Sequence, residues 1–441
     1  MKKKVLLILM LSVIVFVGCN NQVRLEEQDQ QNMYLQKELD SSFDLSIDEV
    51  VKKYIDNNTI VGGVILATKD GKIVFEKAYG YKNLYNVVDA TDLANPKVEK
   101  VQSLEKTTVD TIYDLASCTK IMATTQAIMK LCYEKKINLE DKVTKYLPNF
   151  SKNGKENITI GQLLDHTSGL PQWEPTFLYI ENDRKKELEY IEDLSLIFET
   201  GEVKYSDFGF MTLGFIIEEV TNMQLDKYLE QEIYKPLGMV DTMYNPLDKG
   251  IDKSRIAATS WGNPYEYRMV DEDNYVGFGY DCTKDKEAFL KFKGWRDYTL
   301  IGEVNDGNAS MANGGIAGHA GLFSTVEDLA ILGQLMLNGG SYNKVQIYDK
   351  ATIDLFSENH LGDKNRGYGF ELGKKYMGTK TSIKTYGHSG FTGTHIILDP
   401  ESNVQIIVLT NKQNVGLNEE GSYTSTFSFV GEVVDILMEK M

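Results

Sequence analysis

A serine and a lysine three residues apart are the first residues of this chain that could act together as nucleophile and base. On a helix, this spacing puts the hydroxyl and the amine on one face, a single turn apart. The pattern occurs at three places, namely Ser103/Lys106, Ser117/Lys120 and Ser341/Lys344. Of these pairs, Ser117/Lys120 opens a long apolar stretch, where burial can lower the pKa of a lysine so that it takes the hydroxyl proton. We therefore expect Ser117 to be the nucleophile and Lys120 its proton partner.

A tyrosine followed two residues later by Asn or Asp is a second candidate. This pattern also occurs at three places, namely Tyr54/Asp56, Tyr81/Asn83 and Tyr205/Asp207. Tyr205 directly precedes an apolar helix expected over residues 208–220, with Ser206 or Asp207 as its N-cap. A phenol with a pKa of about 10 is a poor base, but beside an ammonium it ionises more readily and can share a proton with Lys120. The alternative is a tyrosine that only packs at the start of the helix.

A His-x-Gly pattern supplies the third candidate, at His319–Gly321 and at His388–Gly390. His388 directly precedes a strand expected to begin at Thr394, whereas His319 leads into a helix. A strand edge of this kind can offer a backbone N–H to an oxyanion and can pair with an extended substrate. Gly390 would let that substrate approach closely.

The elements that must position these residues are strands at both ends of the chain and helices between them. Strands are expected in pairs, at 61–68 with 72–79 around an Asp70–Gly71 turn, and at 394–398 with 404–409. Helices are expected from Ser46 to Ile55, over 117–135 and over 426–440, with capping boxes at Thr159/Gln162 and Ser324/Glu327. We expect an α/β fold of the α+β type. An antiparallel sheet from residues 45–115 and 345–441 would be flanked by helices, with a mostly helical insert over 116–344.

Composition narrows the classes of function. The 441 residues are 42% hydrophobic and 25% charged, which is typical of a globular protein large enough for two packed lobes. The formal net charge of -17 argues against a nucleic acid as partner. The cysteines and histidines form neither a CxxC pair nor an HExxH motif, and no phosphate-loop or dinucleotide pattern is present. We expect no metal and no cofactor.

The first residues predict a compartment. Lys2–Lys4 precede an apolar run over residues 5–17, which is too short to span a bilayer and reads as a secretory signal. Gly18 and Cys19 then resemble the lipobox of bacterial lipoproteins, in which the cysteine becomes the lipid-bearing first residue. We expect a signal peptide over 1–18, a lipid on Cys19, a polar tether over 19–44 and an extracytoplasmic domain over 45–441, anchored to the cell membrane.

Taken together and in this order, the motifs resemble a known superfamily. Ser117–Lys120, Tyr205–Asp207 and His388–Gly390 are similar to those of the serine β-lactamases and penicillin-binding proteins, in the class C and esterase-related branch. Further similar stretches lie at residues 165–170, 318–324 and 338–340. The resemblance implies a β-lactamase/transpeptidase-like fold. It also implies that Ser117 is the nucleophile, that Lys120 and Tyr205 transfer its proton, and that the N–H groups of Ser117 and Phe391 bind the oxyanion.

One further stretch and two departures bear on the substrate. Residues 302–309 look like a block of the carboxypeptidase-like and muramyl-amidase-like members, which makes Glu303, Asp306 and Asn308 candidates for a substrate loop. The alternative is a turn-rich loop whose Asp and Asn side chains bind the backbone. Asp207 stands where Asn is commoner, and His388 stands where Lys is frequent. Residues 271–295 look like an additional loop to which we assign no role.

We therefore expect an extracytoplasmic serine hydrolase that acts through an acyl-enzyme on amide or ester bonds of peptidoglycan-derived peptides. The alternatives are a small-ester esterase or weak β-lactamase, and a non-catalytic lipoprotein that binds cell-wall fragments. The expected partners are a cell-wall peptide or small ester and, through Cys19, the membrane. Because imidazole is mostly neutral at pH 7, His388 should make the site less dependent on a substrate carboxylate. The preference for carboxylate-bearing substrates should rise as the pH falls through the titration of His388.

Overall fold

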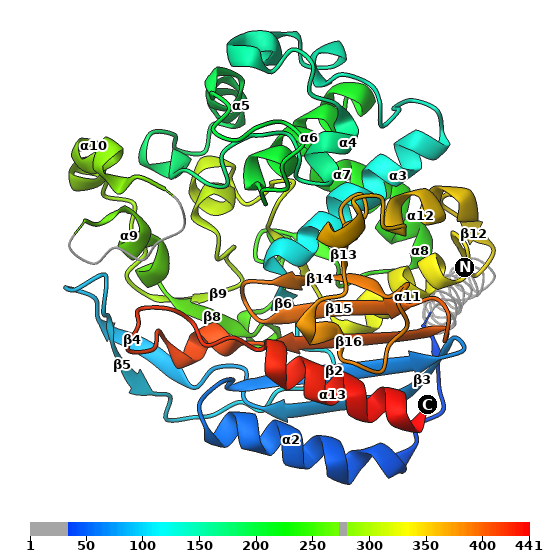
Figure 1. Cartoon of the computed structure of the whole chain (residues 1–441). Coiled ribbons are helices and arrows are strands. Elements are labelled where there is room, and N and C mark those ends of the chain that lie inside the picture. Colours follow the sequence, from blue (N-terminus) through cyan, green and yellow to red (C-terminus); the bar gives the residue numbers. More distant parts are fainter. Residues whose placement is uncertain (1–33, 273–279) are drawn as a thin grey trace, which may run out of the picture.

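The computed structural model describes residues 34–272 and 280–441, and its centre is a seven-stranded sheet (Figure 1). The strand order is β1–β3–β2–β16–β15–β14–β13, and every neighbouring pair is antiparallel except β1 with β3. The strands are β1 (Gln36–Lys37), β2 (Gly62–Lys69), β3 (Lys72–Gly80), β13 (Glu371–Leu372), β14 (Tyr386–Gly390), β15 (Thr394–Asp399) and β16 (Val404–Thr410). Because β2 pairs with β16, the two ends of the chain meet in the middle of the sheet, as predicted.

The hairpin of β2 and β3 confirms the predicted turn. Asp70 and Gly71 have φ values of 51° and 78°, the left-handed pair that a two-residue hairpin requires. Successive residues of β2 then face opposite sides of the sheet, as strand geometry demands. Val64 and Leu66 join one hydrophobic core, while Ile65 and Ala67 join the other.

Helices cover both faces of this sheet. On one face, α2 (Asp44–Asp56) and α13 (Phe427–Lys440) run side by side in Figure 1 and bury residues such as Val51 and Val433. On the other face, α11 (Val326–Leu337) packs against β2 and β16 and joins the larger core. The fold is thus the expected α/β arrangement of an antiparallel sheet flanked by helices.

The predicted insert is mostly helical, as expected, but it also contains short strands. The remaining α-helices are α3 (Thr125–Tyr133), α4 (Ile160–Leu164), α5 (Arg184–Asp193), α6 (Asp207–Thr221), α7 (Leu225–Leu229), α8 (Lys235–Leu237), α9 (Pro264–Val270), α10 (Lys286–Lys291) and α12 (Lys350–Ser357). The small sheets are β4 (Tyr85–Asp89) with β5 (Lys97–Lys100), β6 (Tyr113–Asp114) with β10 (Leu322–Ser324) and β7 (Met243–Tyr244), β8 (Ala258–Trp261) with β9 (Thr299–Ile301), and β11 (Ser341–Tyr342) with β12 (Val345–Gln346). None of the described helices is long and apolar enough to cross a membrane.

Two local predictions on caps have different outcomes. At α4, the side chain of Thr159 accepts from the backbone N–H of Gln162 and the reciprocal bond is present, so the predicted capping box is confirmed. At α11 the predicted box is wrong by one residue. Thr325 is the N-cap and accepts from the N–H of Asp328, because Ser324 is the last residue of β10 and its hydroxyl bonds to Thr242 instead.

The end of the predicted tether belongs to the domain, which is a correction to the sequence analysis. Residues 1–33, including Cys19, lie outside the described part of the chain. From Gln36 the chain pairs with β3, and the side chains of Leu35 and Phe43 are 6% and 2% exposed. Helix α2 begins at Asp44 rather than Ser46, after a 3-10 turn that Asp40 caps. These few apolar residues in a polar stretch find a place in the core.

Phe43 tests whether this segment stabilises the domain. Its ring packs edge to face on Phe75, with 6.2 Å between the ring centroids. We expect Phe43→Ala to lower the free energy of unfolding by about 3–5 kcal/mol, because it leaves a cavity in the core. The matched control is Leu45→Ala, two residues on and 72% exposed, which should change it by less than about 0.5 kcal/mol. Equal effects of the two variants in chemical denaturation would show that the segment is only loosely attached.

Candidate active site

Ser117 lies at the end of a strained turn. Ala116, directly before it, has a φ of 44°, a left-handed conformation that is costly for a residue with a Cβ. The N–H of Ala116 donates to Asp114 Oδ1 at 2.8 Å, which holds the turn in place. Ser117 itself sits in a 3-10 turn (Ala116–Cys118), followed by a π-helical turn (Lys120–Thr124) and then α3. The helix expected over 117–135 therefore exists, but its first two turns are wound differently.

Two side chains, one from the same turn and one from the start of α6, converge on the hydroxyl oxygen of Ser117. Tyr205 Oη lies 2.7 Å from Ser117 Oγ, and Lys120 Nζ lies 3.1 Å from it. Lys120 Nζ also donates to Asp207 Oδ1 at 2.7 Å and to the carbonyl oxygen of His319 at 3.0 Å. All three protons of the buried ammonium thus have an acceptor. The structure brings Ser117, Lys120, Tyr205 and Asp207 together.

The proton of Lys120 is held more firmly than the sequence suggested. Burial by itself lowers the pKa of Lys120, but the negative charge of Asp207, followed by Tyr205, more than offsets this and raises the pKa above its ordinary value. The prediction that the pKa of Lys120 is lowered is therefore wrong, because Asp207, two residues after Tyr205, carries a carboxylate rather than an amide. Lys120 stands beside Ser117 as a permanent ammonium.

Tyr205 is the remaining group that can exchange a proton with Ser117. Burial raises the pKa of Tyr205 to about 12, while the Lys120 ammonium opposes that rise. The ammonium lies 4.8 Å from the centroid of the Tyr205 ring, so it stabilises the phenolate electrostatically. In this arrangement Tyr205 is the candidate base, and the charge of Lys120 makes its phenolate more accessible than burial alone would leave it.

His166 positions Tyr205, a role that sequence reasoning missed. The two rings pack against each other at a tilt of 33°, with 4.6 Å between their centroids. His166 Nδ1 accepts from the backbone N–H of Ser206 at 3.0 Å, and its carbonyl oxygen accepts from the N–H of Lys204 at 2.8 Å. Ser206 in turn caps α6, accepting from the N–H of Gly209. The residues on both sides of Tyr205 are thereby held by His166, which the similar stretch over 165–170 had marked without explaining.

His388 faces the same cavity as Ser117 but is not a ready donor. Its Nδ1 donates to the carbonyl oxygen of Ser389 at 2.7 Å, which leaves Nε2 as an acceptor that is buried and has no partner among the described residues. Burial lowers the pKa of His388 to about 4, although Glu371 opposes this. The imidazole is therefore neutral at pH 7, as expected, but it titrates well below 6.5. A substrate preference that follows its titration near pH 6.5 is no longer expected.

Gly390 lines the cavity beside Ser117, and it is also needed for packing. A Cβ at this position would come within 2.1 Å of Thr394 Oγ1 and 2.4 Å of the carbonyl oxygen of Leu115. The hydroxyl of Thr394 donates to that same carbonyl at 2.9 Å, so β14 and β15 hold the segment before Ser117. Phe391, directly after Gly390, is 41% exposed and lines the cavity together with Ser117.

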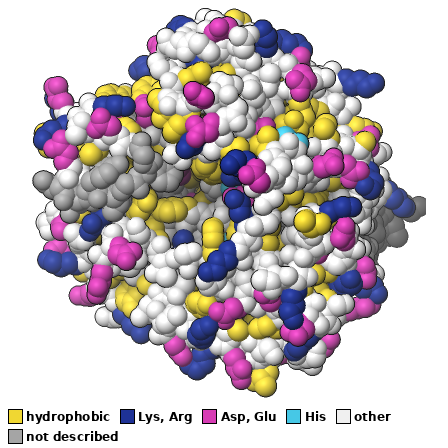
Figure 2. Space-filling view, in the orientation of Figure 1, with side chains coloured by type: hydrophobic (Ala, Val, Ile, Leu, Met, Phe, Trp, Pro, Cys, Tyr) yellow, Lys and Arg dark blue, Asp and Glu magenta, His cyan; other side chains and the backbone are white. Residues whose placement is uncertain are grey.

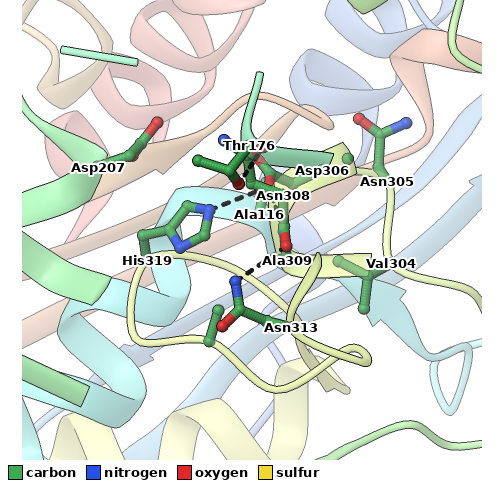
Figure 3. A network of polar contacts seen from close by, with 12 residues as sticks. Ala116, Thr176, Asp207, Val304, Asn305, Asp306, Asn308, Ala309, Asn313 and His319 are labelled. Atoms are coloured by element: carbon green, nitrogen blue, oxygen red, sulfur yellow. Dashed lines mark hydrogen bonds and ion pairs between the residues drawn. The ribbon is translucent and has the colours of Figure 1, made fainter. Parts of the chain in front are cut away.

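Of the three loop candidates, one faces the cavity and two do not. Asp306 lines the cavity, and its Oδ1 bonds to His319 Nε2 at 3.0 Å (Figure 3). Asn308 is fully buried and bonds to Thr176 and the carbonyl oxygen of Glu174, so it has a structural role. Glu303 bonds to the hydroxyl of Tyr298 near the surface. The interpretation of Glu303 and Asn308 as substrate residues is corrected, because their side chains stabilise the loop.

The cavity has a volume of about 480 Å³, and most of its wall was not foreseen from the sequence. Besides Tyr205, five aromatic side chains line it, namely Trp173, Tyr265, Phe391, Tyr423 and Phe427. The charged residues in the wall are Asp207, Glu266, Asp306, Glu371 and Lys412. Hydrophobic side chains also gather near the middle of the face shown in Figure 2, between scattered charges of both signs. Within the described residues, no group of three or more His, Cys, Asp or Glu side chains could hold a metal ion.

Comparison with known proteins identifies the family. A family model described as Beta-lactamase matches residues 47–424. The chain belongs to the β-lactamase family. Curated relatives include an N-acetylmuramyl-L-alanine amidase of Bacillus subtilis, 36% identical over 406 residues, which cover 86% of this chain and 85% of the relative. A putative D-alanyl-D-alanine carboxypeptidase of Escherichia coli is 36% identical over 368 residues, covering 79% of this chain and 77% of the relative.

Solved structures show the same fold at low sequence identity. A penicillin-binding protein homologue from Caulobacter crescentus superposes with a TM-score of 0.63 at 18% identity, covering 91% of this chain and 98% of that one. A class C β-lactamase superposes with a TM-score of 0.62 at 16% identity, covering 90% and 98%. The β-lactamase/transpeptidase-like fold predicted from the motifs is confirmed, and with the family it makes the protein a serine hydrolase.

The convergence on Ser117 Oγ predicts the result of covalent labelling. Ser117→Ala should abolish labelling by a fluorophosphonate probe, because the attacking oxygen is removed. Lys120→Ala and Tyr205→Phe should each lower turnover roughly 10²- to 10⁴-fold, the usual effect of a positioned acid–base group. Ser103 and Ser341 stand in the same spacing pattern, and the controls Ser103→Ala and Ser341→Ala should be labelled like the wild type. Labelling that persists in Ser117→Ala would refute the assignment of the nucleophile.

The Lys120–Asp207 ion pair predicts a shift in the pH profile. Asp207→Asn removes the charge that keeps the pKa of Lys120 high, so burial then lowers that pKa. If the ammonium is the active form, the alkaline limb of kcat/KM should move to lower pH by about 1–3 units. The matched control, Asp193→Asn, breaks a surface ion pair with Lys152 and should leave the limb in place. An unchanged limb in Asp207→Asn would mean that the charge of Lys120 does not govern the reaction.

Proposed function

We propose that the protein cleaves amide bonds in peptidoglycan-derived peptides on the extracytoplasmic side of the membrane. The observation that carries the proposal is the Ser117–Tyr205–Lys120 cluster at the wall of a cavity large enough for a short peptide. Two relatives at 36% identity support the substrate class, since both are named for the hydrolysis of cell-wall peptides.

The reaction follows from the three contacts. The Tyr205 phenolate, stabilised by the Lys120 ammonium, accepts the proton of Ser117 while Oγ attacks the scissile carbonyl carbon. The family resemblance assigns the oxyanion of the tetrahedral intermediate to the N–H groups of Ser117 and Phe391. When the C–N bond breaks, Tyr205 returns the proton to the departing amine, and the acyl group remains on Ser117. Water then attacks the ester and gives its proton to Tyr205. As the bond between the acyl carbon and Ser117 Oγ breaks, Tyr205 passes this proton to Ser117 Oγ, which releases the carboxylic acid and restores the phenolate.

Hydrolysis of small esters is the second candidate. The aromatic side chains in the cavity wall suit an apolar acyl or alcohol group, and one structural neighbour is described as EstCE1, a hydrolase with promiscuous acyltransferase activity. An ester and an amide pass through the same acyl-enzyme, so the two candidates differ only in the leaving group.

Identification of products from muropeptides tests the proposal. The protein, starting no later than residue 34, is incubated with muramyl-peptides and with free pentapeptides, and the products are identified by mass spectrometry. Release of the whole peptide from muramic acid would indicate an amidase, and loss of one terminal alanine a carboxypeptidase. Neither product should form with Ser117→Ala. Hydrolysis of short-chain esters without either product would instead establish the esterase.

The location is also a proposal, supported by the basic start, the apolar run and Cys19. Cys19→Ala should prevent lipid attachment, so the protein should fail to incorporate a labelled fatty acid and should leave the membrane fraction. The matched control, Cys132→Ala, keeps the candidate lipid site and should remain labelled and membrane-bound. A Cys19→Ala variant that is still labelled and sedimented with membranes would contradict the proposed anchor.

A further inference from the structure

Arg366 is a buried cation beside the catalytic tyrosine that the reaction above does not use. Its side chain is 7% exposed, and its guanidinium carbon lies 6.0 Å from the centroid of the Tyr205 ring. It belongs to the segment between α12 and β13, which folds back on itself because Arg366 forms an isolated β-bridge with Glu371. The fold thus places a second positive charge near the ring that the Lys120 ammonium already approaches.

The charge of Arg366 is only partly compensated by its neighbour Glu371. Arg366 Nη2 lies 3.6 Å from Glu371 Oε1, which is close enough for an ion pair but too long for a hydrogen bond. The other carboxylate oxygen of Glu371 accepts from the hydroxyl of Tyr376 at 2.9 Å. Among residues 34–272 and 280–441, the buried Nη1 of Arg366 has no hydrogen-bond partner. The guanidinium therefore acts on the groups around it mainly through its charge.

This charge reaches the two histidines that pack on Tyr205. The ring centroids of His166 and His388 lie 4.6 and 6.3 Å from that of Tyr205. Burial lowers the pKa of His166 most, and the charge of Arg366 comes next. Burial also lowers the pKa of His388 most, with Lys120 and Arg366 adding to the effect. A cation that disfavours protonation of both neighbouring rings also favours deprotonation of the phenol between them.

The reaction needs such a charge, because its base is a phenolate. Burial raises the pKa of Tyr205 to about 12, and Lys120 opposes that rise. Lys120, however, is paired with Asp207 at 2.7 Å, and the charge of Asp207 acts on Tyr205 in the opposite direction. The other groups around the ring that could be charged are Arg366 with Glu371 and the two histidines, which are neutral at pH 7. In the described part of the chain, Lys120 and Arg366 are the cations over the Tyr205 ring.

We propose that Arg366 is a positioning residue of the reaction, whose charge stabilises the Tyr205 phenolate that accepts the proton of Ser117. Arg366 is not among the residues that line the cavity, so it acts through Tyr205 and touches no substrate. This inference rests on the part of the proposed function in which Tyr205 is the base, and it does not depend on the identity of the substrate.

The pH dependence of inactivation by a fluorophosphonate probe tests this role without an identified substrate. Arg366→Gln removes a positive charge, so the pKa of Tyr205 should rise and less phenolate should be present at each pH. The rising part of the profile should move to higher pH by about 0.5–1.5 units, and inactivation at pH 7 should slow roughly 3- to 30-fold. Arg366→Lys keeps the charge and should recover most of the loss.

Glu371→Gln is the variant of opposite sign. It removes the partner's negative charge, so the profile should move to lower pH and inactivation at pH 7 should become faster. Damage to the fold would slow both variants and cannot produce opposite shifts. The matched control is Arg184→Gln, since Arg184 lies 5.0 Å from the centroid of the Phe215 ring and pairs with Glu218 outside the cavity, and its profile should not move.

Shifts of Arg366→Gln and Glu371→Gln in the same direction, or unmoved profiles in both, would overturn the inference. Should Arg366→Gln not fold, Glu371→Gln decides by itself: a profile moved to lower pH supports the role of Arg366, and an unmoved one refutes it.

A double variant shows whether Arg366 acts through Tyr205. In the Tyr205→Phe background no phenolate can form, so Arg366→Gln should change the inactivation rate less than about twofold. The same loss there as in the wild-type background would refute the inference. If Tyr205→Phe is inactivated as fast as the wild type, Tyr205 is not the base and the proposed reaction itself fails. If Tyr205→Phe is slow but Arg366→Gln behaves like the wild type, the reaction stands and only the role of Arg366 fails.

Discussion

The buried ammonium of Lys120 is the constraint on which the site depends. Moving such a charge out of water costs several kcal/mol, and the fold keeps it only because every proton has an acceptor. Those acceptors come from the adjoining turn of Ser117 and from two distant segments, the start of α6 at Asp207 and the segment before β10 at His319. Any element that moves leaves part of the charge unsatisfied. The arrangement of the catalytic side chains and the packing of the insert therefore stabilise each other.

This constraint also distributes the chemistry among the residues. A lysine tied to a carboxylate keeps its proton, which leaves Tyr205 as the group able to exchange one with Ser117. The loop of Asp306 supports the same charge indirectly, because Asp306 orients His319 and the carbonyl of His319 accepts from Lys120. A similar balance extends along the cavity wall, where histidine is neutral at position 388 and positive charge appears at Lys412.

Local patterns in the sequence predicted the elements well, and predicted contacts between distant elements poorly. The Asp70–Gly71 turn, the strands of both chain ends and the Thr159 capping box depend on near neighbours, so their residue types suffice. Ser117, Lys120 and Tyr205 were selected because each adjoins a long apolar helix. The raised pKa of Lys120 could not be foreseen, since it depends on a distance of 2.7 Å to a residue 87 positions away.

The same limit explains the remaining misses. Lys412 and Glu266 belong to no recognised sequence motif, and only the folded structure shows that they share a cavity with Ser117. Glu303 and Asn308 belong to a motif, yet its conspicuous polar side chains bind the protein itself. The polar stretch before residue 45 has few apolar residues, and composition alone does not reveal that Leu35 and Phe43 are buried. His166 follows the short helix α4, and its contact with the ring of Tyr205 emerges only in space.

The short strand β1 has a consequence for solubility. It covers the outer side of β3 at Lys72 and Ile73, the first of nine residues that form this edge of the sheet and whose outward N–H and C=O groups could pair with another strand. Such an edge is a template on which a second chain can add a strand. The other edge is formed by β13, which is only two residues long and offers little to pair with. A few residues ahead of the first helix thus shield the start of β3 from edge-to-edge association with other molecules.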